Sequence, residues 1–321
     1  MIRRAARGAL LALMTGCAMA RPMLVGVPLT DLRAHPRTVA QPSVHDPEEE
    51  TQLFYGEPVR VLEEHNGWVR VEAMEQAEFS HATRWQGYPG WLPKSDLMAA
   101  HDQQPPSIVV ADPWVAAWTN AYLTDAASLQ FPMGTLLSAI EIGHQVWRIE
   151  LPDGEFVWIP HGAARPLEQV AALPHAEKRR MILHSAQRLI GEPYYWGGRA
   201  ARSNARANRA AGFDCSGVVN VAYRTVGLAI PRDAHEQFLR AKKISTLQPA
   251  DLIFLSAPND PSRIVHVMLY AGDGDLIEAP QTGNTVRRIS LRERLGRTID
   301  QLTPGTVIDG QTVFFGSYLP A

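Results

Sequence analysis

The pattern of apolar residues changes once along the chain, and this change limits the folds that the chain can adopt. Up to about residue 160, apolar and polar residues alternate, as in "QLFYGEPVRVLEEHNGWVRVEA" (52–73) and "HQVWRIELPDGEFVWIP" (144–160). Alternation on both sides of a turn such as Asn66-Gly67 predicts a β-hairpin. Beyond residue 175, helical spacing comes first and strands follow, so we predict all-β units followed by an α+β domain.

The two alternating stretches resemble each other. The pattern of "LFYGEPVRVL" (53–62) returns in "FPMGTLLSAI" (131–140), and both hairpins end in Trp, an aliphatic residue and Pro. We therefore expect two tandem small β-barrels, at residues 50–100 and 108–166. An extended arm at residues 21–49 would precede them.

The C-terminal part, residues 175–321, is predicted to be an α+β domain. Apolar residues in "HAEKRRMILHSAQRLIG" (175–191) fall on one helical stripe, with Gly191 at its end. A second helix is predicted by "SGVVNVAYRTVG" (216–227). Strands are then expected at residues 251–256, 264–270, 274–279 and 285–290.

Residues 1–20 have the composition of a secretory leader. The charged "MIRRAAR" precedes the apolar "GALLALMTG", which is too short to span a bilayer. The stretch "MTGC" would lipidate Cys17, whereas "AMA" would allow simple cleavage after Ala20, and both routes remain open. We expect an exported protein that is either periplasmic or lipid-anchored at the outer membrane through Cys17.

The charge of the chain argues against nucleic acid as a partner. The formal net charge is −2, and without the leader it becomes −5, with 28 basic and 33 acidic residues. This composition gives no basic footprint for nucleic acid. The sequence also has no His-Glu-x-x-His motif and no Cys-x-x-Cys pair, so we expect no metal site. It shows no binding site for an organic cofactor, so we expect none of these either.

Cys215 has no cysteine partner in the mature chain, because the only other cysteine, Cys17, lies in the leader. A lone cysteine in a chain with several histidines is either a candidate nucleophile or a small buried hydrophobe. Here it stands at the start of a predicted helix, which Asp214 or Ser216 could cap. Free N–H groups and the helix dipole at that position stabilise a thiolate.

A thiolate nucleophile needs a base, and the base needs a group that orients it. His266 lies in the apolar strand "IVHVMLY", and Glu278 follows twelve residues later in "LIEAP". A two-residue turn at "GDG" (272–274) would place them on opposite faces, whereas a three-residue turn with a bulge would place them on the same face. A core histidine and a solvent-facing acid remain alternatives at these positions.

Six motifs occur in a fixed order around Cys215. They are "GEPYYWGG" (191–198), "DCSG" (214–217), "IPRDAHEQ" (230–237), "PADLIFL" (249–255), "VHVMLYAGDG" (265–274) and "LIEAP" (276–280). Together they resemble the NlpC/P60 family of papain-like cysteine peptidases, over roughly the last 145 residues. The two predicted β-barrels resemble bacterial SH3 (SH3b) domains, so the implied layout is that of three-domain peptidases that recycle cell-wall peptides.

The resemblance implies the catalytic residues. Cys215 matches the nucleophile of the family and His266 matches its base. Glu278 stands at the third position, where the family most often has histidine, and an acid there would fix the tautomer of His266. The backbone N–H of Cys215 would stabilise the oxyanion.

The resemblance also implies where the substrate binds. Asp214 and Ser216 match positions that recognise its free amine and its backbone. One of the adjacent tyrosines, Tyr194 or Tyr195, would line the site beside the thiol. A serine often found in the "IPRDAHEQ" segment is Ala234 here, so one polar contact would have to come from elsewhere.

In three-domain relatives the first SH3b domain closes one end of the substrate groove, where an acid and a tyrosine select a free N-terminal L-Ala. Glu57 in "YGEPV" and Tyr88 in "GYPGW" stand at fitting positions. Each also fits an ordinary strand or turn residue.

Three functions remain open from the sequence. The first is a cysteine endopeptidase that cleaves the bond between γ-D-glutamate and a diamino acid, diaminopimelate, in murein peptides with a free N-terminal L-Ala. The second is an amidase or acyltransferase on the same fold. The third is a non-catalytic peptidoglycan-binding protein. In each case we expect a monomer whose partners are peptidoglycan-derived peptides.

Overall fold

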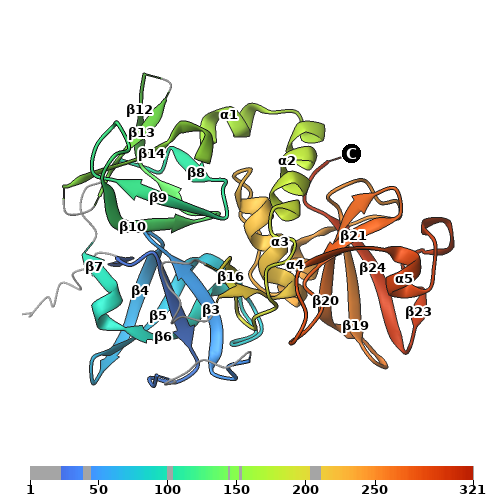
Figure 1. Ribbon diagram of the computed structural model, residues 1–321. Coiled ribbons are helices and arrows are strands. Elements are labelled where there is room, and N and C mark those ends of the chain that lie inside the picture. The colour runs from blue at the N-terminus through green and yellow to red at the C-terminus, as the bar shows by residue number, and fades with distance from the viewer. Residues whose placement is uncertain are drawn as a thin grey trace, which may run out of the picture.

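Three structural units follow one another along the chain. The computed structural model describes residues 23–38, 45–99, 104–143, 145–151, 154–202 and 211–320. Figure 1 shows two β-rich units on one side and a third unit, with most of the helices, on the other. The predicted leader, including Cys17, lies outside the described residues. Within the described part, no helix is long and apolar enough to cross a membrane.

The first β-unit is an antiparallel sheet of seven strands around its own core. Its strands are β1 (Met23–Val25), β2 (Leu29–Arg33), β3 (Glu49–Phe54), β4 (Pro58–His65), β5 (Trp68–Glu78), β6 (Gln86–Pro93) and β7 (Leu97–Ala99), with a 3-10 helix at Lys94–Asp96. Hydrogen bonds join them in the order β3-β2-β6-β5-β4-β1-β7. The predicted turn at Asn66-Gly67 is confirmed, because both residues have positive φ between β4 and β5. Buried aliphatic side chains such as Leu32, Leu53 and Val71 fill the core.

The prediction of an extended arm at residues 21–49 is wrong for the described part of that segment. β1 pairs with β4 and β7, and β2 pairs with β3 and β6. Leu29 and Leu32 of β2 are almost completely buried. These strands are three and five residues long and lie among prolines, so they offer too few alternating positions for a periodicity to be recognised.

The second β-unit is built from two smaller antiparallel sheets. Its strands are β8 (Ile108–Val110), β9 (Trp114–Trp118), β10 (Ala126–Pro132), β11 (Leu136–Leu137), β12 (Ala139–Ile142), β13 (Val146–Glu150), β14 (Phe156–Pro160) and β15 (Ala164–Pro166), with a 3-10 helix at His161–Ala163. One sheet has the order β10-β9-β14-β13-β12 and the other the order β11-β8-β15. Both sheets enclose a core that includes Ile108, Phe131 and Ile159.

The C-terminal unit packs helices against an antiparallel sheet. Its helices are α1 (Leu167–Ala172), α2 (His175–Gln187), α3 (Cys215–Arg224), α4 (Ala234–Arg240) and α5 (Leu291–Leu295), with a 3-10 helix at Ile299–Gln301. Its strands are β16 (Arg199–Ala200), β17 (Gly212–Phe213), β18 (Lys242–Lys243), β19 (Leu252–Ala257), β20 (Asp260–Gly272), β21 (Asp275–Glu278), β22 (Arg287–Ser290), β23 (Val307–Ile308) and β24 (Gln311–Ser317). The main sheet has the order β18-β24-β19-β20-β21-β22.

The predicted elements of this unit are confirmed, and others are added. The two predicted helices correspond to α2 and α3, and the four predicted strands to β19 through β22. The additional β24 lies inside the sheet, between β18 and β19. This strand comes from "QTVFFGS" near the C-terminus, a run too short to distinguish a strand from a helix by periodicity.

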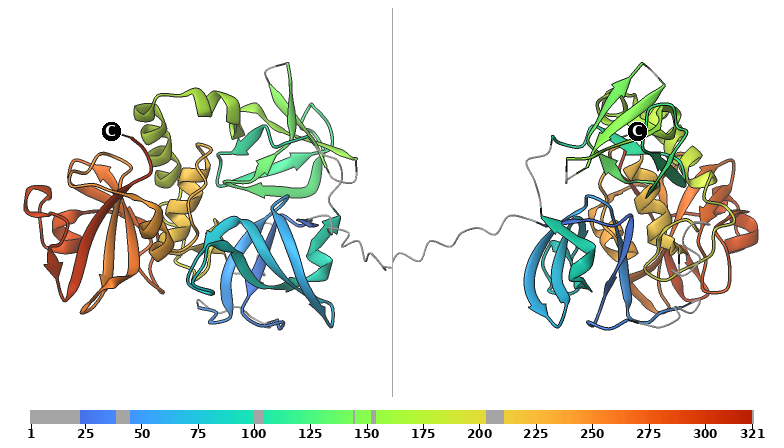
Figure 2. Two further views of the ribbon diagram at one scale, coloured as in Figure 1. Left: turned by 180° about the vertical axis from the view of Figure 1, so that it is seen from behind. Right: turned by 60° about the vertical axis from the view of Figure 1, so that its left-hand side comes forward.

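Helix α3 lies where the three units meet. Figure 2 shows α2 and α3 between the C-terminal sheet and the two β-units. At the end of α3, Arg224 donates from Nε to the carbonyl oxygen of Gly134 in the second β-unit, at 2.6 Å. The same guanidinium lies 3.5 Å from Glu57 of the first β-unit. The helix that begins at Cys215 is therefore fixed against both β-units.

Candidate active site

Cys215 is the first residue of α3 and the one free cysteine among the described residues. Its side chain is half-buried, and its backbone N–H belongs to the helical turn that has no intrahelical acceptor. Two glycines allow the close packing at this point, because a Cβ on Gly217 would lie 2.2 Å from the carbonyl oxygen of Gly198. The glycines in "YWGG" and "DCSG" are thus required by the backbone contact beneath the thiol.

Asp214 caps α3 and forms a buried ion pair. Its Oδ1 accepts from the N–H of Gly217 at 2.6 Å, and its Oδ2 accepts from the N–H of Gly197 at 3.0 Å. Both oxygens also accept from Arg232, at 3.1 and 2.7 Å. Ser216 Oγ donates to Asp214 and accepts from Arg232. These contacts give Asp214 and Ser216 a structural role at the start of the helix; the predicted contacts with substrate stay a prediction.

His266 and Glu278 lie on the same face of the sheet and contact each other. The turn between β20 and β21 is formed by Asp273 and Gly274, and a register shift next to it supplies the bulge that brings the two side chains onto one face. His266 Nε2 donates to Glu278 Oε2 at 2.9 Å. The Cys215 side chain also hydrogen-bonds the imidazole. Because Nε2 donates to Glu278, Nδ1 is the ring nitrogen that remains for Cys215. Cys215, His266 and Glu278 thus form a continuous chain of polar contacts.

The charges around His266 stabilise its protonated form. Burial disfavours a charged imidazole, but the charge of Cys215 and the hydrogen bonds with Cys215 and Glu278 outweigh it and raise the pKa of His266 to about 9. The site therefore favours the imidazolium form of His266 at neutral pH. A thiolate is the nucleophilic form of cysteine, and an imidazolium can donate a proton to a leaving group.

Glu278 is held by two arginines as well as by His266. Its side chain is fully buried, and Arg287 donates to Oε1 from Nε and from Nη2, at 3.1 and 2.7 Å. Arg294 donates from Nε to both oxygens, at 3.0 Å each. Burial alone would raise the pKa of Glu278, but His266, Arg287 and Arg294 lower it to about 2. Glu278 is therefore ionised over the whole working range of a peptidase.

The two adjacent tyrosines face different surroundings. Burial, together with the nearby Asp214 and Cys215, raises the pKa of the Tyr194 phenol. Tyr195 lies near Glu49 and the other acids of the first β-unit, which have the same effect on its pKa. Tyr194 is therefore the tyrosine beside the thiol, and Tyr195 contacts the first β-unit.

The structure gives different partners to the two residues that were predicted to select a free amine, Tyr88 and Glu57. The Tyr88 hydroxyl lies 2.9 Å from Asp233 Oδ2 and 3.3 Å from Glu50 Oε2. Partial burial, with the charges of Asp214 and Glu236, raises the pKa of Asp233 to about 7 in spite of the opposing charge of Arg232. Tyr88 is thus part of an acidic cluster, formed by Tyr88, Glu50 and Asp233, where the first β-unit meets the C-terminal unit.

The prediction for Glu57 is wrong. Its carboxylate is buried and accepts from Arg199 Nη1 at 3.0 Å and from Gln76 Nε2 at 3.0 Å. Glu57 follows the turn at Gly56, so a local motif could not show that its side chain points into the contact with β16 rather than toward the substrate. Within the first β-unit, Glu50 rather than Glu57 is the acid whose carboxylate lies beside Tyr88.

Comparison with known proteins agrees with this geometry. Residues 191–299, which include Cys215, His266 and Glu278, match the NlpC/P60 family. The chain contains an NlpC/P60 domain. It is 28% identical over 250 residues to a gamma-D-glutamyl-L-lysine dipeptidyl-peptidase of Bacillus cereus, covering 75% of this chain and 70% of that relative. A protein of the same name from Bacillus subtilis is 26% identical over 254 residues, which cover 77% of each chain.

The likeness extends to the fold of the whole chain. The crystal structure of an NlpC/P60 family protein from Bacillus cereus superposes with a TM-score of 0.71 at 22% identity, covering 93% of this chain and all of that one. The β-rich units ahead of the NlpC/P60 domain are therefore part of a shared architecture. Their assignment as SH3b domains, and the boundaries given for them, stay predictions.

Sequence reasoning missed four charged residues around the NlpC/P60 site: Arg232, Asp233, Arg287 and Arg294. Arg232 and Asp233 lie inside the motif "IPRDAHEQ", directly before α4. A charged pair within this motif was the one sequence feature that could have pointed to them. The two arginines on Glu278 come from "VRRISLRERLGR", where several arginines look alike and only the fold shows which ones turn inward. Within the described ranges, no cluster of three or more histidine, cysteine or acidic side chains is arranged to hold a metal ion.

Proposed function

We propose that the protein is a cell-wall peptide hydrolase, a cysteine endopeptidase that cleaves the bond between the γ-carboxyl of D-glutamate and a diamino acid. The observation that carries this proposal is the chain of contacts from Cys215 through His266 to Glu278, at the start of a helix in an NlpC/P60 domain. The names of the two Bacillus relatives, and a murein DD-endopeptidase of Escherichia coli that is 37% identical over 119 residues, support a peptide of the cell wall as substrate.

The geometry performs the reaction in two steps. The Cys215 thiolate attacks the carbonyl carbon, and the N–H at the start of α3 stabilises the negative oxygen. His266 donates its proton to the leaving amine, so that the C–N bond breaks and a thioester remains. The neutral imidazole then takes a proton from water, the resulting hydroxide displaces the thiolate, and the acid product leaves.

We further propose that the substrate is a short peptide with a free N-terminal L-Ala, as in murein recycling. The acidic cluster of Tyr88, Glu50 and Asp233 supports this. One phenol can donate only one proton, yet two carboxylates lie within hydrogen-bond distance of it. An ammonium group would supply the missing donors and the opposite charge. Asp233 follows Arg232, which itself binds Asp214 beside the thiol, so the cluster lies on the Asp214 side of the nucleophile.

The cellular setting is part of the same proposal. The leader sequence supports export to the periplasm, with or without a lipid on Cys17. The tandem repeat supports two SH3b domains ahead of the catalytic domain. We expect the protein to act as a monomer on peptides released from peptidoglycan.

The test uses the mature protein and two synthetic peptides. One is L-Ala-γ-D-Glu-diaminopimelate and the other is the same peptide acetylated on its alanine; products are followed by mass spectrometry. We expect the wild type to release the diamino acid from the free-amine peptide only, and Cys215→Ala to cleave neither. Glu50→Gln should raise KM for the free-amine peptide roughly tenfold, the size expected for one lost hydrogen bond to a charged group. Glu64→Gln is its control, because Glu64 is an exposed acid of the same β-unit.

Each contradicting result has a separate meaning. Cleavage of both peptides by the wild type would contradict selection of a free amine but keep the peptidase. Cleavage of neither peptide would contradict the peptidase and favour a binding protein. Activity that survives in Cys215→Ala would show that the nucleophile is wrong.

A further inference from the structure

Arg294 offers two free nitrogen atoms next to the catalytic residues. It binds Glu278 through Nε alone, at 3.0 Å to each oxygen. Its terminal nitrogens make no hydrogen bond to any residue of the described ranges, and its side chain is 26% exposed. By contrast, Arg287 donates to the same carboxylate from both Nε and Nη2, so it has one terminal nitrogen left. Of the two arginines that bind Glu278, Arg294 is therefore the one that can offer a second carboxylate the paired donors of a bidentate contact.

The chemistry of the reaction places the leaving group near this arginine. His266 must donate a proton to the leaving amine, so the diamino acid lies on the His266 side of the scissile bond. Arg294 lies two hydrogen bonds from the imidazole, because Glu278 accepts from both residues. The acidic cluster of Tyr88, Glu50 and Asp233 is connected to Cys215 through other residues, Asp214 and Arg232, and not through His266.

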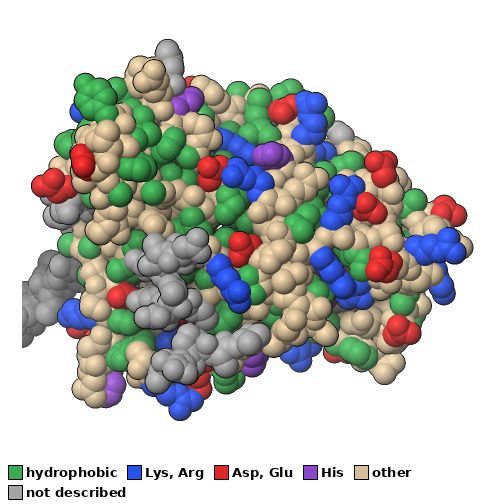
Figure 3. All heavy atoms as spheres, viewed as in Figure 1, with side chains coloured by type: hydrophobic (Ala, Val, Ile, Leu, Met, Phe, Trp, Pro, Cys, Tyr) green, Lys and Arg blue, Asp and Glu red, His purple; other side chains and the backbone are tan. Residues whose placement is uncertain are grey.

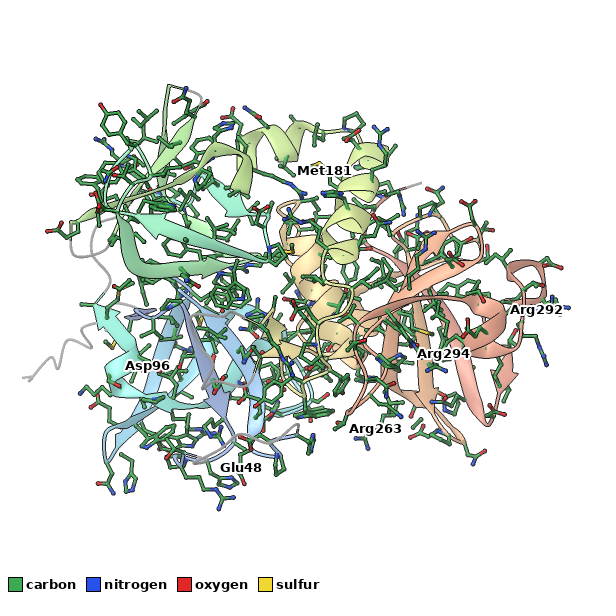
Figure 4. All side chains as sticks on the ribbon, viewed as in Figure 1. Glu48, Asp96, Met181, Arg263, Arg292 and Arg294 are labelled. Atoms are coloured by element: carbon green, nitrogen blue, oxygen red, sulfur yellow. The ribbon has the colours of Figure 1, made fainter. Side chains whose placement is uncertain are left out.

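The local charge also favours another anion. His266, Arg287 and Arg294 carry three positive charges when His266 is protonated, and the one carboxylate that they share is that of Glu278. Five arginines and one acid lie between residues 287 and 297. Figure 3 shows blue side chains among red ones over this part of the molecule, and Figure 4 shows Arg294 inside the outline of the sheet while Arg292 lies at the outer edge.

These observations distinguish between the two common diamino acids of cell-wall peptides. Lysine and diaminopimelate differ by one carboxylate, which diaminopimelate carries on the carbon that bears its second amine. That carboxyl carbon lies six bonds from the leaving nitrogen, a reach of ~7 Å when extended, at the ~1.2 Å per bond of an extended chain. We propose that Arg294 binds this second carboxylate, so that the protein prefers diaminopimelate to lysine. The inference rests on the proposed function and specifies its substrate.

The experiment compares kcat/KM for L-Ala-γ-D-Glu-diaminopimelate and L-Ala-γ-D-Glu-L-Lys. The wild type should prefer the diaminopimelate peptide roughly 10- to 100-fold, as expected for a charge-assisted hydrogen-bonded contact. Arg294→Gln should bring the ratio close to 1. It should also slow both reactions by a common factor, because Arg294 holds Glu278, and the ratio removes that factor. Arg294→Lys keeps the positive charge but lacks the planar pair of N–H donors of a guanidinium, so it should give an intermediate ratio. Arg292→Gln is the matched control on the same helix and should keep the wild-type ratio.

A second readout does not depend on turnover. Calorimetry on Cys215→Ala, with and without Arg294→Gln, measures the affinity for both peptides. The inference is supported if Arg294→Gln weakens binding of the diaminopimelate peptide alone. It is overturned if the wild type cleaves both peptides equally well, or if the ratio survives in Arg294→Gln; cleavage itself would still support the proposed function. If the wild type cleaves neither peptide, the proposed function fails, and equal affinities in calorimetry would overturn the inference as well.

Discussion

At the scale of single residues, Glu278 determines how the candidate catalytic histidine behaves. A buried carboxylate that contacts two arginines and an imidazole stays ionised, and it therefore stabilises the imidazolium form of His266. The sequence showed that Glu278 stands at the third position of the catalytic group and that an acid can orient a histidine. It did not show that Glu278 contacts His266, because this contact depends on one bulged residue near the turn at Asp273 and Gly274.

Replacing Glu278 by Gln should move the alkaline limb of the pH profile. In the wild type the pKa of His266 is raised to about 9, so kcat/KM should fall as the pH rises through that value and the imidazolium loses its proton. Without the carboxylate the pKa of His266 should fall. The alkaline limb should then lie at lower pH by roughly 1 to 3 pH units, the effect of one nearby opposite charge. The measurement is kcat/KM from pH 5 to 10.

Asp275→Asn is the matched control for this change. Asp275 lies on the same strand and pairs with Arg288 at the surface, so its replacement removes the same charge without touching His266. Its profile should follow the wild type. An unchanged alkaline limb in Glu278→Gln would mean that Glu278 does not act on His266.

At the scale of elements, the start of α3 shows what a motif can and cannot reveal. The sequence predicted the helix and gave Asp214 as one of its two candidate caps, and the structure confirms both. The close contact between Gly198 and Gly217 was not predicted, although both glycines belong to motifs that the sequence analysis quoted. The partner of that cap was missed, since Arg232 lies eighteen residues further along and is fully buried. Long-range ion pairs of this kind leave no periodic signal. The prediction of an arm in place of β1 and β2 failed for a different reason, since these strands are too short to show a periodicity.

Asp214→Ala should destabilise the protein far more than the loss of an ordinary helix cap. The change removes the acceptor for Gly217 N–H and leaves the Arg232 guanidinium buried without its main counter-charge. Breaking a buried ion pair from one side costs about 3–5 kcal/mol, so the free energy of unfolding in urea should fall by about that amount. Ser290→Ala is the control, because Ser290 caps α5 at an exposed position and should cost only about 1 kcal/mol. Equal losses in both variants would show that the pair with Arg232 adds nothing.

At the scale of the whole molecule, the first β-unit and the NlpC/P60 domain share a buried contact that the sequence did not predict. Arg199 of β16 reaches into the first β-unit, where its Nη1 donates to Glu57 and to the carbonyl oxygen of Gln52. Its guanidinium lies 4.4 Å from the centre of the Phe54 ring. The tandem β-units were visible as repeats because hairpin periodicity is local. Their position on the catalytic domain was not, because Arg199 and Glu57 are 142 residues apart. This contact sets where Tyr88 and Glu50 lie relative to the thiol.

Arg199→Met should therefore affect both stability and substrate selection. It leaves the buried Glu57 with a neutral donor, Gln76, and with the more distant Arg224 as its counter-charge, so the free energy of unfolding should fall by about 3 kcal/mol. A loosened first β-unit should also let the acetylated peptide be cleaved, while the reaction of the free-amine peptide keeps its kcat. Arg60→Met, which removes an exposed arginine of the same β-unit, should cost no more than about 1 kcal/mol and keep the selection. Urea titration and the two-peptide assay measure these effects. If Arg199→Met lost stability but still rejected the acetylated peptide, the position of the first β-unit would not be what selects the free amine.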